Sequence, residues 1–371
     1  MGRLLPARGS ALAAAALTII TGCNGETQAP GNVTPGEGLI SPAAGSLTQA
    51  WSVPLPSQGA GVAVHPVSGL LYVTVAQGGE GAFRRGGGIV TISSSGVPGT
   101  EIALQMKPCA DSVCPVFMPN APVISPDGSA LYVGDNSWNA YFFATHLGFF
   151  FDVRPHGRIL PGDRIDGISG ASEIDIANSR VLIPGSALYS LDMSDGEVRV
   201  AREVDSPIRQ VTRAGARRYI LNQTAPQATQ GRLSVWNPLS DRLRKFDLPA
   251  PVHWVSSQKG WTVALSSDGD ECVISELKFM ENSSEPRISL EKIGSFRPLG
   301  RSGCPGYRMA LAGESRVVVL GGEGQAFAVR AATGRSYFMA VERVRGIAVS
   351  PDESAVHVVE PTRVKTFVLS P

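Results

Sequence analysis

Residues 122–133 read Pro-Val-Ile-Ser-Pro-Asp-Gly-Ser-Ala-Leu-Tyr-Val, which is an apolar strand, a tight turn and a second apolar strand. Proline presets φ for the turn, and Asp or Gly completes it. The same arrangement recurs at 62–75 around His65-Pro66, and at 347–359 around Ser350-Pro351-Asp352. A unit that recurs in this way indicates a repeat architecture.

Weaker copies keep the strand–turn–strand pattern without the proline. They lie at 174–183, 208–221, 252–265 and 308–320. Six steps from Pro66 to Pro351 give roughly 48 residues per repeat, which is within the range of propeller blades. Second hairpins lie between the copies, so each repeat supplies four strands. We therefore expect an all-β fold, a seven-bladed β-propeller of four-stranded antiparallel blades, over residues 47–371. A solenoid is less favoured, because no segment resembles a polar cap.

Two repeats carry a recognisable motif. Ser125-Pro126-Asp127-Gly128, followed by Tyr132-Val133, resembles the core of the YVTN-type propeller repeat. Tyr72-Val73-Thr74-Val75 matches its eponymous strand except at the last residue. The resemblance, which extends more weakly to the last repeat, implies the fold, and it is nearly silent on function. Because Pro, Asp and Gly are turn formers, we expect them to be structural.

The last repeat is one strand short at the C-terminus. It supplies two strands near 346–349 and 355–359 and a third at 363–369. We expect the unassigned apolar segment 47–55 to pair as the outer strand of this blade, since open sheet edges are costly.

The first 22 residues resemble the signal peptide of a bacterial lipoprotein. A short positive start precedes an apolar run at 11–20 that is too short to span a bilayer comfortably. The run ends in Ile20-Thr21-Gly22-Cys23, which is similar to a lipobox and implies that Cys23 is acylated and becomes the mature N-terminus. The alternative is an ordinary signal peptide with an accidental cysteine.

Residues 23–46 are rich in Pro, Gly, Thr and Ser and have no apolar periodicity, so we expect a flexible tether. Asn24, rather than Asp, follows the lipobox cysteine, which favours the outer membrane. The expected protein is a monomer of the bacterial cell envelope, attached to the membrane by its lipid.

Four cysteines remain beyond the anchor. They are Cys109, Cys114, Cys272 and Cys304. An even number in an oxidising compartment indicates two disulfides, and proximity in sequence favours the pairs 109–114 and 272–304 among three possible pairings. A four-thiolate metal site is the weaker interpretation, since neither pair has Cys-x-x-Cys spacing.

No catalytic signature stands out. The 33 Lys and Arg balance the 32 Asp and Glu, so no nucleic-acid partner is indicated. No two of the five histidines have metal-ligand spacing, and we expect His65 and His357, inside repeats, to be structural. Residues 268–271 read Asp-Gly-Asp-Glu and could hold Ca²⁺, but they do not fit the EF-hand register. We expect no cofactor.

Propellers usually bind ligands where the loops between second and third strands meet the segments that link blades. The candidate binding residues on these loops are Asp135, Trp138, His253, Trp254, Asp270, Glu271, Arg345 and Glu360. Trp138 is the sharpest of them, because it lies among small polar residues with no obvious core to fill.

The preferred hypothesis is a binding or scaffold module for a protein, peptide or glycan. The alternative is an enzyme, because some propellers of the YVTN-like and related kinds are lactonases or dehydrogenases, and a channel metal site would then be needed. A purely structural surface protein is a third possibility. A faint resemblance to the quinoprotein-like assembly factor of the outer-membrane barrel machinery lacks that family's repeated docking motif.

Overall fold

The computed structural model describes residues 45–76, 88–103, 121–134, 139–146, 149–158, 173–175, 178–185, 187–192, 198–204, 207–222, 229–281 and 285–369. Several predicted features lie outside these residues. They are the signal peptide, Cys23, the tether up to residue 44, Cys109, Cys114, Asp135 and Trp138.

The described strands form seven sheets, numbered here in chain order. Sheet 1 consists of β3 (Gly59–Val64), β4 (Leu71–Val75), β5 (Gly88–Ile92) and β6 (Pro98–Ala103). Sheet 2 consists of β7 (Val123–Ile124), β8 (Ala130–Gly134), β9 (Asn139–His146) and β10 (Phe149–Arg158). Sheet 3 consists of β11 (Glu173–Asp175), β12 (Arg180–Pro184), β13 (Leu188–Asp192) and β14 (Val198–Arg202). Sheet 4 consists of β15 (Ile208–Ala214), β16 (Arg217–Asn222), β17 (Gly231–Asn237) and β18 (Arg242–Leu248). Sheet 5 consists of β19 (Val252–Gln258), β20 (Trp261–Asp268), β21 (Glu271–Met280) and β22 (Arg287–Phe296).

The last two sheets include strands from both ends of the described chain. Sheet 6 consists of β23 (Arg308–Ala312), β24 (Val317–Gly321), β25 (Ala326–Arg330), β26 (Ser336–Met339) and β1 (Gly45–Ser46). Sheet 7 consists of β27 (Gly346–Val349), β28 (Ala355–Val359), β29 (Arg363–Val368) and β2 (Gln49–Pro54). The other six sheets are four-stranded and antiparallel, whereas sheet 6 also carries β1 in a parallel pair with β26.

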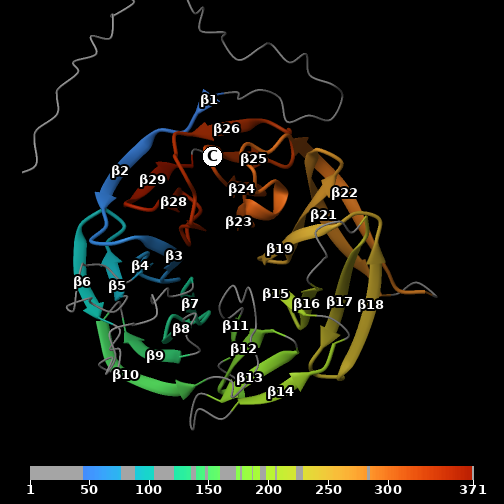
Figure 1. The fold of residues 1–371 in the computed structure, drawn as a ribbon, viewed down its shortest axis with the longest axis horizontal. Helices are drawn as coiled ribbons and strands as arrows, with labels where there is room; N and C mark the ends of the chain where they lie inside the picture. Colours follow the sequence, from blue (N-terminus) through green and yellow to red (C-terminus); the bar gives the residue numbers. More distant parts are fainter. Residues whose placement is uncertain are drawn as a thin grey trace, which may run out of the picture. The chain divides into compact units, whose positions relative to one another are not determined.

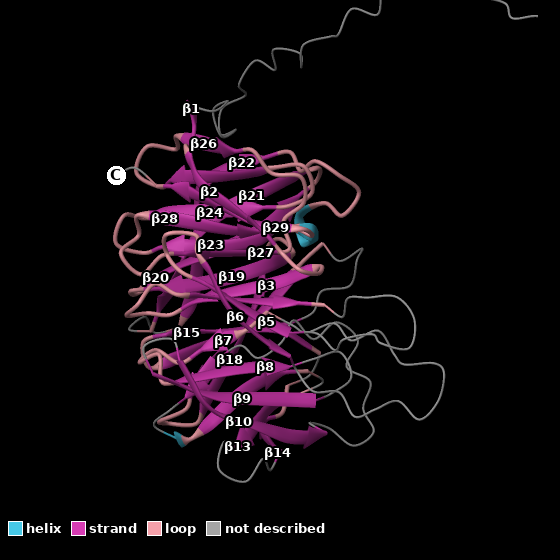
Figure 2. Ribbon diagram, turned by 90° about the vertical axis from the view of Figure 1, so that its left-hand side faces the viewer, coloured by secondary structure: helices cyan, strands magenta, loops and turns pink. Residues whose placement is uncertain are grey.

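The first strand of each repeat lies innermost. The seven strands β3, β7, β11, β15, β19, β23 and β27 each contact the next in this order, and β27 contacts β3. The sheets therefore follow one another round a closed ring, within the compact unit that contains every described strand (Figure 1). Nearly all of the regular secondary structure in the described residues is β-strand (Figure 2). The predicted all-β propeller is confirmed.

The repeat turns form as their sequence predicts. In sheet 2, the Ser125 hydroxyl donates to Asp127 at 2.5 Å and accepts from the Ala130 amide at 2.9 Å. The Asp127 carboxylate also accepts the Ser129 amide at 3.0 Å. These bonds satisfy the polar groups of a tight turn between two buried strands, so the structural interpretation of this motif is confirmed.

The predicted closure of the ring is also confirmed. Strand β2 pairs antiparallel with β29, from Gln49 opposite Phe367 to Pro54 opposite Arg363. The preceding β1 falls within the segment expected to be tether, and the Leu47 amide donates to Phe338 O at 2.8 Å. The exposed edge of β26 thus offers backbone partners to residues that have no apolar pattern of their own.

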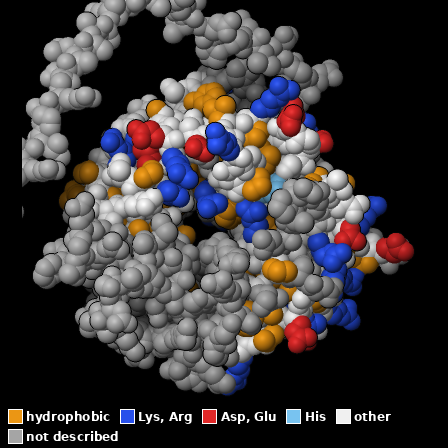
Figure 3. All heavy atoms as spheres, viewed as in Figure 1, with side chains coloured by type: hydrophobic (Ala, Val, Ile, Leu, Met, Phe, Trp, Pro, Cys, Tyr) orange, Lys and Arg blue, Asp and Glu red, His pale blue; other side chains and the backbone are white. Residues whose placement is uncertain are grey.

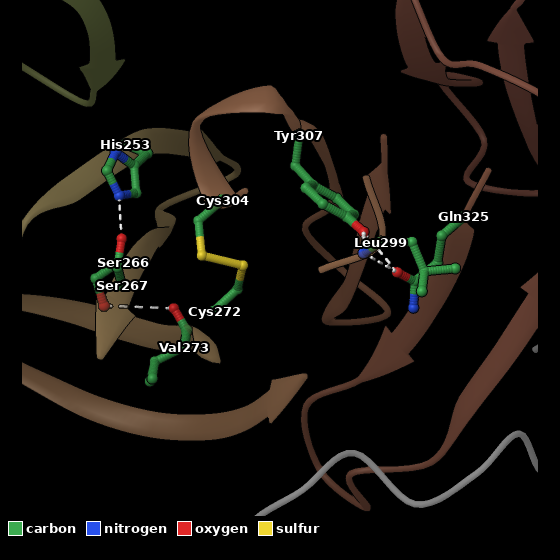
Figure 4. The surroundings of a disulfide bond; sticks show 9 residues. All are labelled: His253, Ser266, Ser267, Cys272, Val273, Leu299, Cys304, Tyr307 and Gln325. Atoms are coloured by element: carbon green, nitrogen blue, oxygen red, sulfur yellow. Dashed lines mark hydrogen bonds between the residues drawn. A yellow bond between two sulfur atoms is a disulfide. The ribbon is translucent and has the colours of Figure 1, made fainter. Parts of the chain in front are cut away.

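Apolar side chains from facing sheets form the core. Strands β4 and β24 are buried at every position, because each sheet is covered on both faces. Cys272 on β21 is bonded to Cys304, as the spacing predicted (Figure 4). Closing this 32-residue loop contributes roughly 3–4 kcal/mol in the chain-entropy account. None of the helices in the described segments is long and apolar enough to cross a membrane.

Candidate functional site

Four side chains gather where the innermost strands of sheets 4 to 7 begin. Arg209 lies on β15, Trp254 on β19 and Arg308 on β23, and Arg345 immediately precedes β27. Segments that link sheets enter the ring at this end, which we call the channel mouth. Figure 3 shows Lys and Arg side chains beside the central hollow of the face drawn.

The Trp254 ring lies between two guanidinium groups. The Arg209 guanidinium carbon is 5.8 Å from the ring centroid, and that of Arg308 is 5.2 Å from it. Cations at this distance are attracted by the ring quadrupole. The indole Nε1 of Trp254 is buried and has no hydrogen-bond partner among the described residues. The Trp254 ring therefore contacts two arginines, and its Nε1–H donates no hydrogen bond to the described residues.

Arginine charges dominate this region. Burial lowers the pKa of Arg308, and the charge of Arg345 lowers it further. Burial and then Arg308 lower the pKa of Arg209, whereas burial and then Arg343 lower that of Arg345. The Nε of Arg345 is buried without a hydrogen-bond partner in the described chain. These groups remain protonated at neutral pH, so they repel one another.

A β-bulge helps to place Arg209. The pairing of β15 with β16 shifts between Ile208 and Gln210, which makes Arg209 the extra residue. Bulges re-aim side chains and are frequent beside functional sites. The guanidinium also donates to Pro305 O at 3.1 Å, in the short helix η3 (Cys304–Gly306). Sheet 4 is thereby connected to the segment that links sheets 5 and 6.

A cavity of about 320 Å³ adjoins the channel mouth at sheet 6. It is lined by Leu299, Ser302, Gly303, Pro305, Gly306, Arg308, Glu323, Arg343, Val344 and Arg345. Three of these side chains are cationic and one is anionic. The cavity is therefore bordered by one innermost strand and by both linking segments that flank it.

The wall of this cavity is fixed by two sets of bonds. The disulfide ties η3 to β21, and the Tyr307 hydroxyl donates to the Gln325 side-chain oxygen at 2.5 Å (Figure 4). The Leu299 amide donates to both oxygens at 3.3 Å. Burial raises the pKa of Tyr307, so its hydroxyl keeps the proton that this bond needs.

The predicted candidates fall into different places. Trp254 and Arg345 both lie at the channel mouth. His253 is buried, and its Nε2 contacts the Ser267 hydroxyl (Figure 4). Burial, followed by the charge of Arg209, lowers the pKa of His253 to about 4, so this imidazole is neutral at neutral pH. In the structure, His253 therefore binds its own sheet.

The predicted acidic candidates do not converge. Glu360 is buried, and its carboxylate accepts the Glu342 amide at 2.5 Å and the Lys365 ammonium at 3.0 Å. It thus holds the segment that links sheets 6 and 7. Asp270 is exposed in the turn between β20 and β21, and Glu271 begins β21. Within the described ranges, no three His, Cys, Asp or Glu residues are arranged to hold a metal ion.

Sequence reasoning missed Arg209, Arg308 and Arg343. A signal was present for Arg209 and Arg308, because the apolar residue followed by arginine seen at 344–345 recurs at 208–209 and 307–308, near the start of innermost strands, whereas Arg343 does not follow this pattern.

Comparison with known proteins shows which fold the chain shares with a solved structure. The chain matches no protein-family model and no curated protein. It is similar to the solved β-propeller domain of Cps50 (Swd1) from Myceliophteria thermophila, a WD40-type propeller. The TM-score is 0.63 at 10% sequence identity, over 87% of this chain and 100% of that chain. At this identity, the likeness shows the fold alone.

Proposed function

We propose that this protein is a lipid-anchored binding or scaffold module of the bacterial cell envelope. In this proposal, it holds a protein, peptide or glycan at the channel mouth. The observation that carries the proposal is the Trp254 ring between Arg209 and Arg308, with its buried Nε1 lacking a partner in the described chain. Aromatic and arginine side chains are enriched at the centres of binding surfaces.

The fold is compatible with this proposal. Propellers commonly serve as binding modules, but one fold hosts many functions, so the site has to carry the argument. At the channel mouth, side chains from four consecutive sheets approach one another, three of them on strands and Arg345 directly before one. Sites built on strands are more precise than sites built on loops.

Several finer features belong to the proposal. We propose seven blades, counting the five-stranded sheet as one, with repeats of the YVTN type. Asp135 and Trp138 would add to the binding face, and Asp270 and Glu271 would lie on its rim. Cys109 and Cys114 would form the second disulfide. The protein would act as a monomer, without a cofactor or a nucleic-acid partner.

The proposed anchor is tested by labelling cells with a radioactive fatty acid. The protein should incorporate the label and sediment with the outer membrane, whereas Cys23→Ala should do neither. Cys109→Ala is a matched control, because it removes a thiol that the anchor does not use. Equal labelling of wild type and Cys23→Ala would contradict the anchor.

The binding function is tested by affinity capture of the native protein from membranes. A partner recovered with wild type should be lost with Trp254→Leu and Arg345→Gln, and kept with Arg242→Gln, an exposed change on the outer strand β18. Trp138→Ala should lose the partner while stability stays within about 1 kcal/mol, whereas a fall of about 3–5 kcal/mol would make Trp138 a core residue. Retention of the partner by every mouth variant would place the site elsewhere.

A further inference from the structure

The arginines of the cavity have too little opposite charge around them. Arg308, Arg343 and Arg345 face one carboxylate, that of Glu323, which belongs to an exposed residue. None of the three arginines forms a salt bridge or a side-chain hydrogen bond with any described residue. Arg308 and Arg345 are partly buried, whereas Arg343 is exposed. A partly buried cation without a counter-anion is costly, because it loses hydration that a ring contact, such as that of Arg308 with Trp254, offsets only in part.

The neighbouring groups increase this cost. Burial lowers the pKa of Arg308 and of Arg209 most, and the charge of Arg345 lowers the first further and that of Arg308 the second, so each guanidinium lies within reach of another positive charge. Clustered like charges destabilise a fold unless something else compensates them. A bound anion would provide that compensation.

The cavity is also held open in a fixed shape. One wall is tied to β21 by the disulfide, and the backbones of Glu323 and Arg343 pair across the opposite side. The Trp254 ring supports Arg308 from the side of sheet 5. Preorganised donors of this kind bind without the cost of ordering flexible side chains.

The chemistry of the lining defines the ligand class. Guanidinium groups present a planar fork of donors that matches the oxygens of a carboxylate or a phosphate. A volume of about 320 Å³ lies at the lower end of small-molecule pockets. We propose that this cavity, between the two linking segments of sheet 6, binds the carboxylate or phosphate group of a small ligand or of a ligand's terminus. The proposal rests on the proposed binding function and adds the chemical class of what is bound.

The test is calorimetric titration of the purified mature protein in detergent, with inorganic phosphate and with D-glucuronate at constant ionic strength. D-glucose is the neutral counterpart of glucuronate. Arg308→Gln and Arg345→Gln should each weaken anion binding roughly 10- to 100-fold, the range expected for losing one charge-assisted hydrogen bond. Arg242→Gln should bind as wild type does, because this arginine lies on the outer strand β18.

The two probes separate the sources of the oxyanion. If only glucuronate binds in an arginine-dependent way, the ligand group is a carboxylate. If only phosphate does, the ligand group is a phosphate. If both do, the cavity recognises the chemistry that the two groups share. The ligand-free variants should also melt no lower than wild type, because each removes a repelled charge. This melting measurement shows whether a variant is folded.

Three results would overturn the proposal. They are no binding of either anion, equal binding by wild type and both folded variants, and glucose bound as tightly as glucuronate. If both variants failed to fold, the arginines would be structural, and the proposal would fall as well. Partner capture that still depended on Trp254 would then preserve the proposed function without the anion site.

Discussion

Two turns of the propeller share one sequence motif but contact the preceding sheet in different ways. In sheet 2, Ser125-Pro126-Asp127 is followed by Gly128; in sheet 7, Ser350-Pro351-Asp352 is followed by Glu353. In both turns, the serine hydroxyl donates to the aspartate and accepts the amide five residues after the serine at 2.9 Å. The fourth residue has positive φ in each, 76° for Gly128 and 57° for Glu353.

The fourth residue determines how each turn contacts the preceding sheet. A Cβ at Gly128 would lie 2.6 Å from Nε2 of His65, so the absence of a side chain leaves room for an imidazole from sheet 1. The Glu353 carboxylate instead accepts the amides of Glu314 and Ser315, at 2.9 and 2.8 Å, from the turn of sheet 6. The shared motif therefore specifies the turn, and the variable fourth position specifies the contact with the preceding sheet. We call this contact the lock between sheets.

Removal of β2 should have the largest effect, because sheet 7 then loses its outer strand and the ladder that β2 forms with β29. A mature chain that begins at Gln58 loses the buried Val53 and the bond from Trp51 Nε1 to Ser94 O. We expect a loss of about 5 kcal/mol from the exposed apolar surface and the missing ladder. A chain that begins at Leu47 is the control, since it lacks only β1. An unchanged thermal melting curve for the shorter chain would count against closure by β2.

Gly128→Glu gives the turn of sheet 2 the residue found in sheet 7. The new Cβ would meet His65, and the positive φ would disfavour a side chain, so we expect a loss of roughly 2–4 kcal/mol in urea unfolding. Adding His65→Ala should recover part of this loss, because the clash is then removed. If Gly128→Glu alone left stability unchanged, the lock would not depend on the missing side chain.

The reverse exchange, Glu353→Gly, should be milder. It relieves a strained backbone conformation worth about 1 kcal/mol but removes a buried carboxylate that accepts three hydrogen bonds. We expect a net loss of roughly 1–2 kcal/mol in the free energy of unfolding. Glu353→Gln keeps the backbone conformation and one acceptor oxygen, so it should lose less. A stabilised Glu353→Gly protein would show that strain outweighs the lock.

Lowering the pH should slightly reduce the stability of both turns. Hydrogen bonds from Ser350 and Ser354 hold the pKa of Asp352 at about 2, below its usual 3.8, and similar bonds lower that of Asp127. Because the folded pKa is depressed, this stabilisation is present above about pH 4 and disappears as the pH falls through about 2. Urea unfolding at pH 7, 4 and 2.5 measures it. Asp352→Asn should flatten the dependence below pH 4, and an unaltered profile would contradict the assignment.

Local chemistry made most of the fold predictable. The Ser-Pro-Asp turns, the spacing of Cys272 and Cys304 and the unpaired apolar segment before Gln58 each depend on residues near one another or on a simple count of strands. The channel mouth was harder to predict, because Arg209, Arg308 and Arg345 come from separate repeats and meet only once the ring has formed. A sequence also shows neither the bulge at His253 nor the bond of this residue to Ser267.

The pairing of β2 with β29 also sets the order of events during synthesis. The ribosome makes β2 among the first described residues and β29 among the last, so the two partners span nearly the whole described chain. The ring cannot close until β29 has been made, and until then β2 lacks its partner strand. Contacts this distant in sequence slow folding and leave strand edges open to other chains. The edge of β2 is therefore open to aggregation until β29 is available to pair with it.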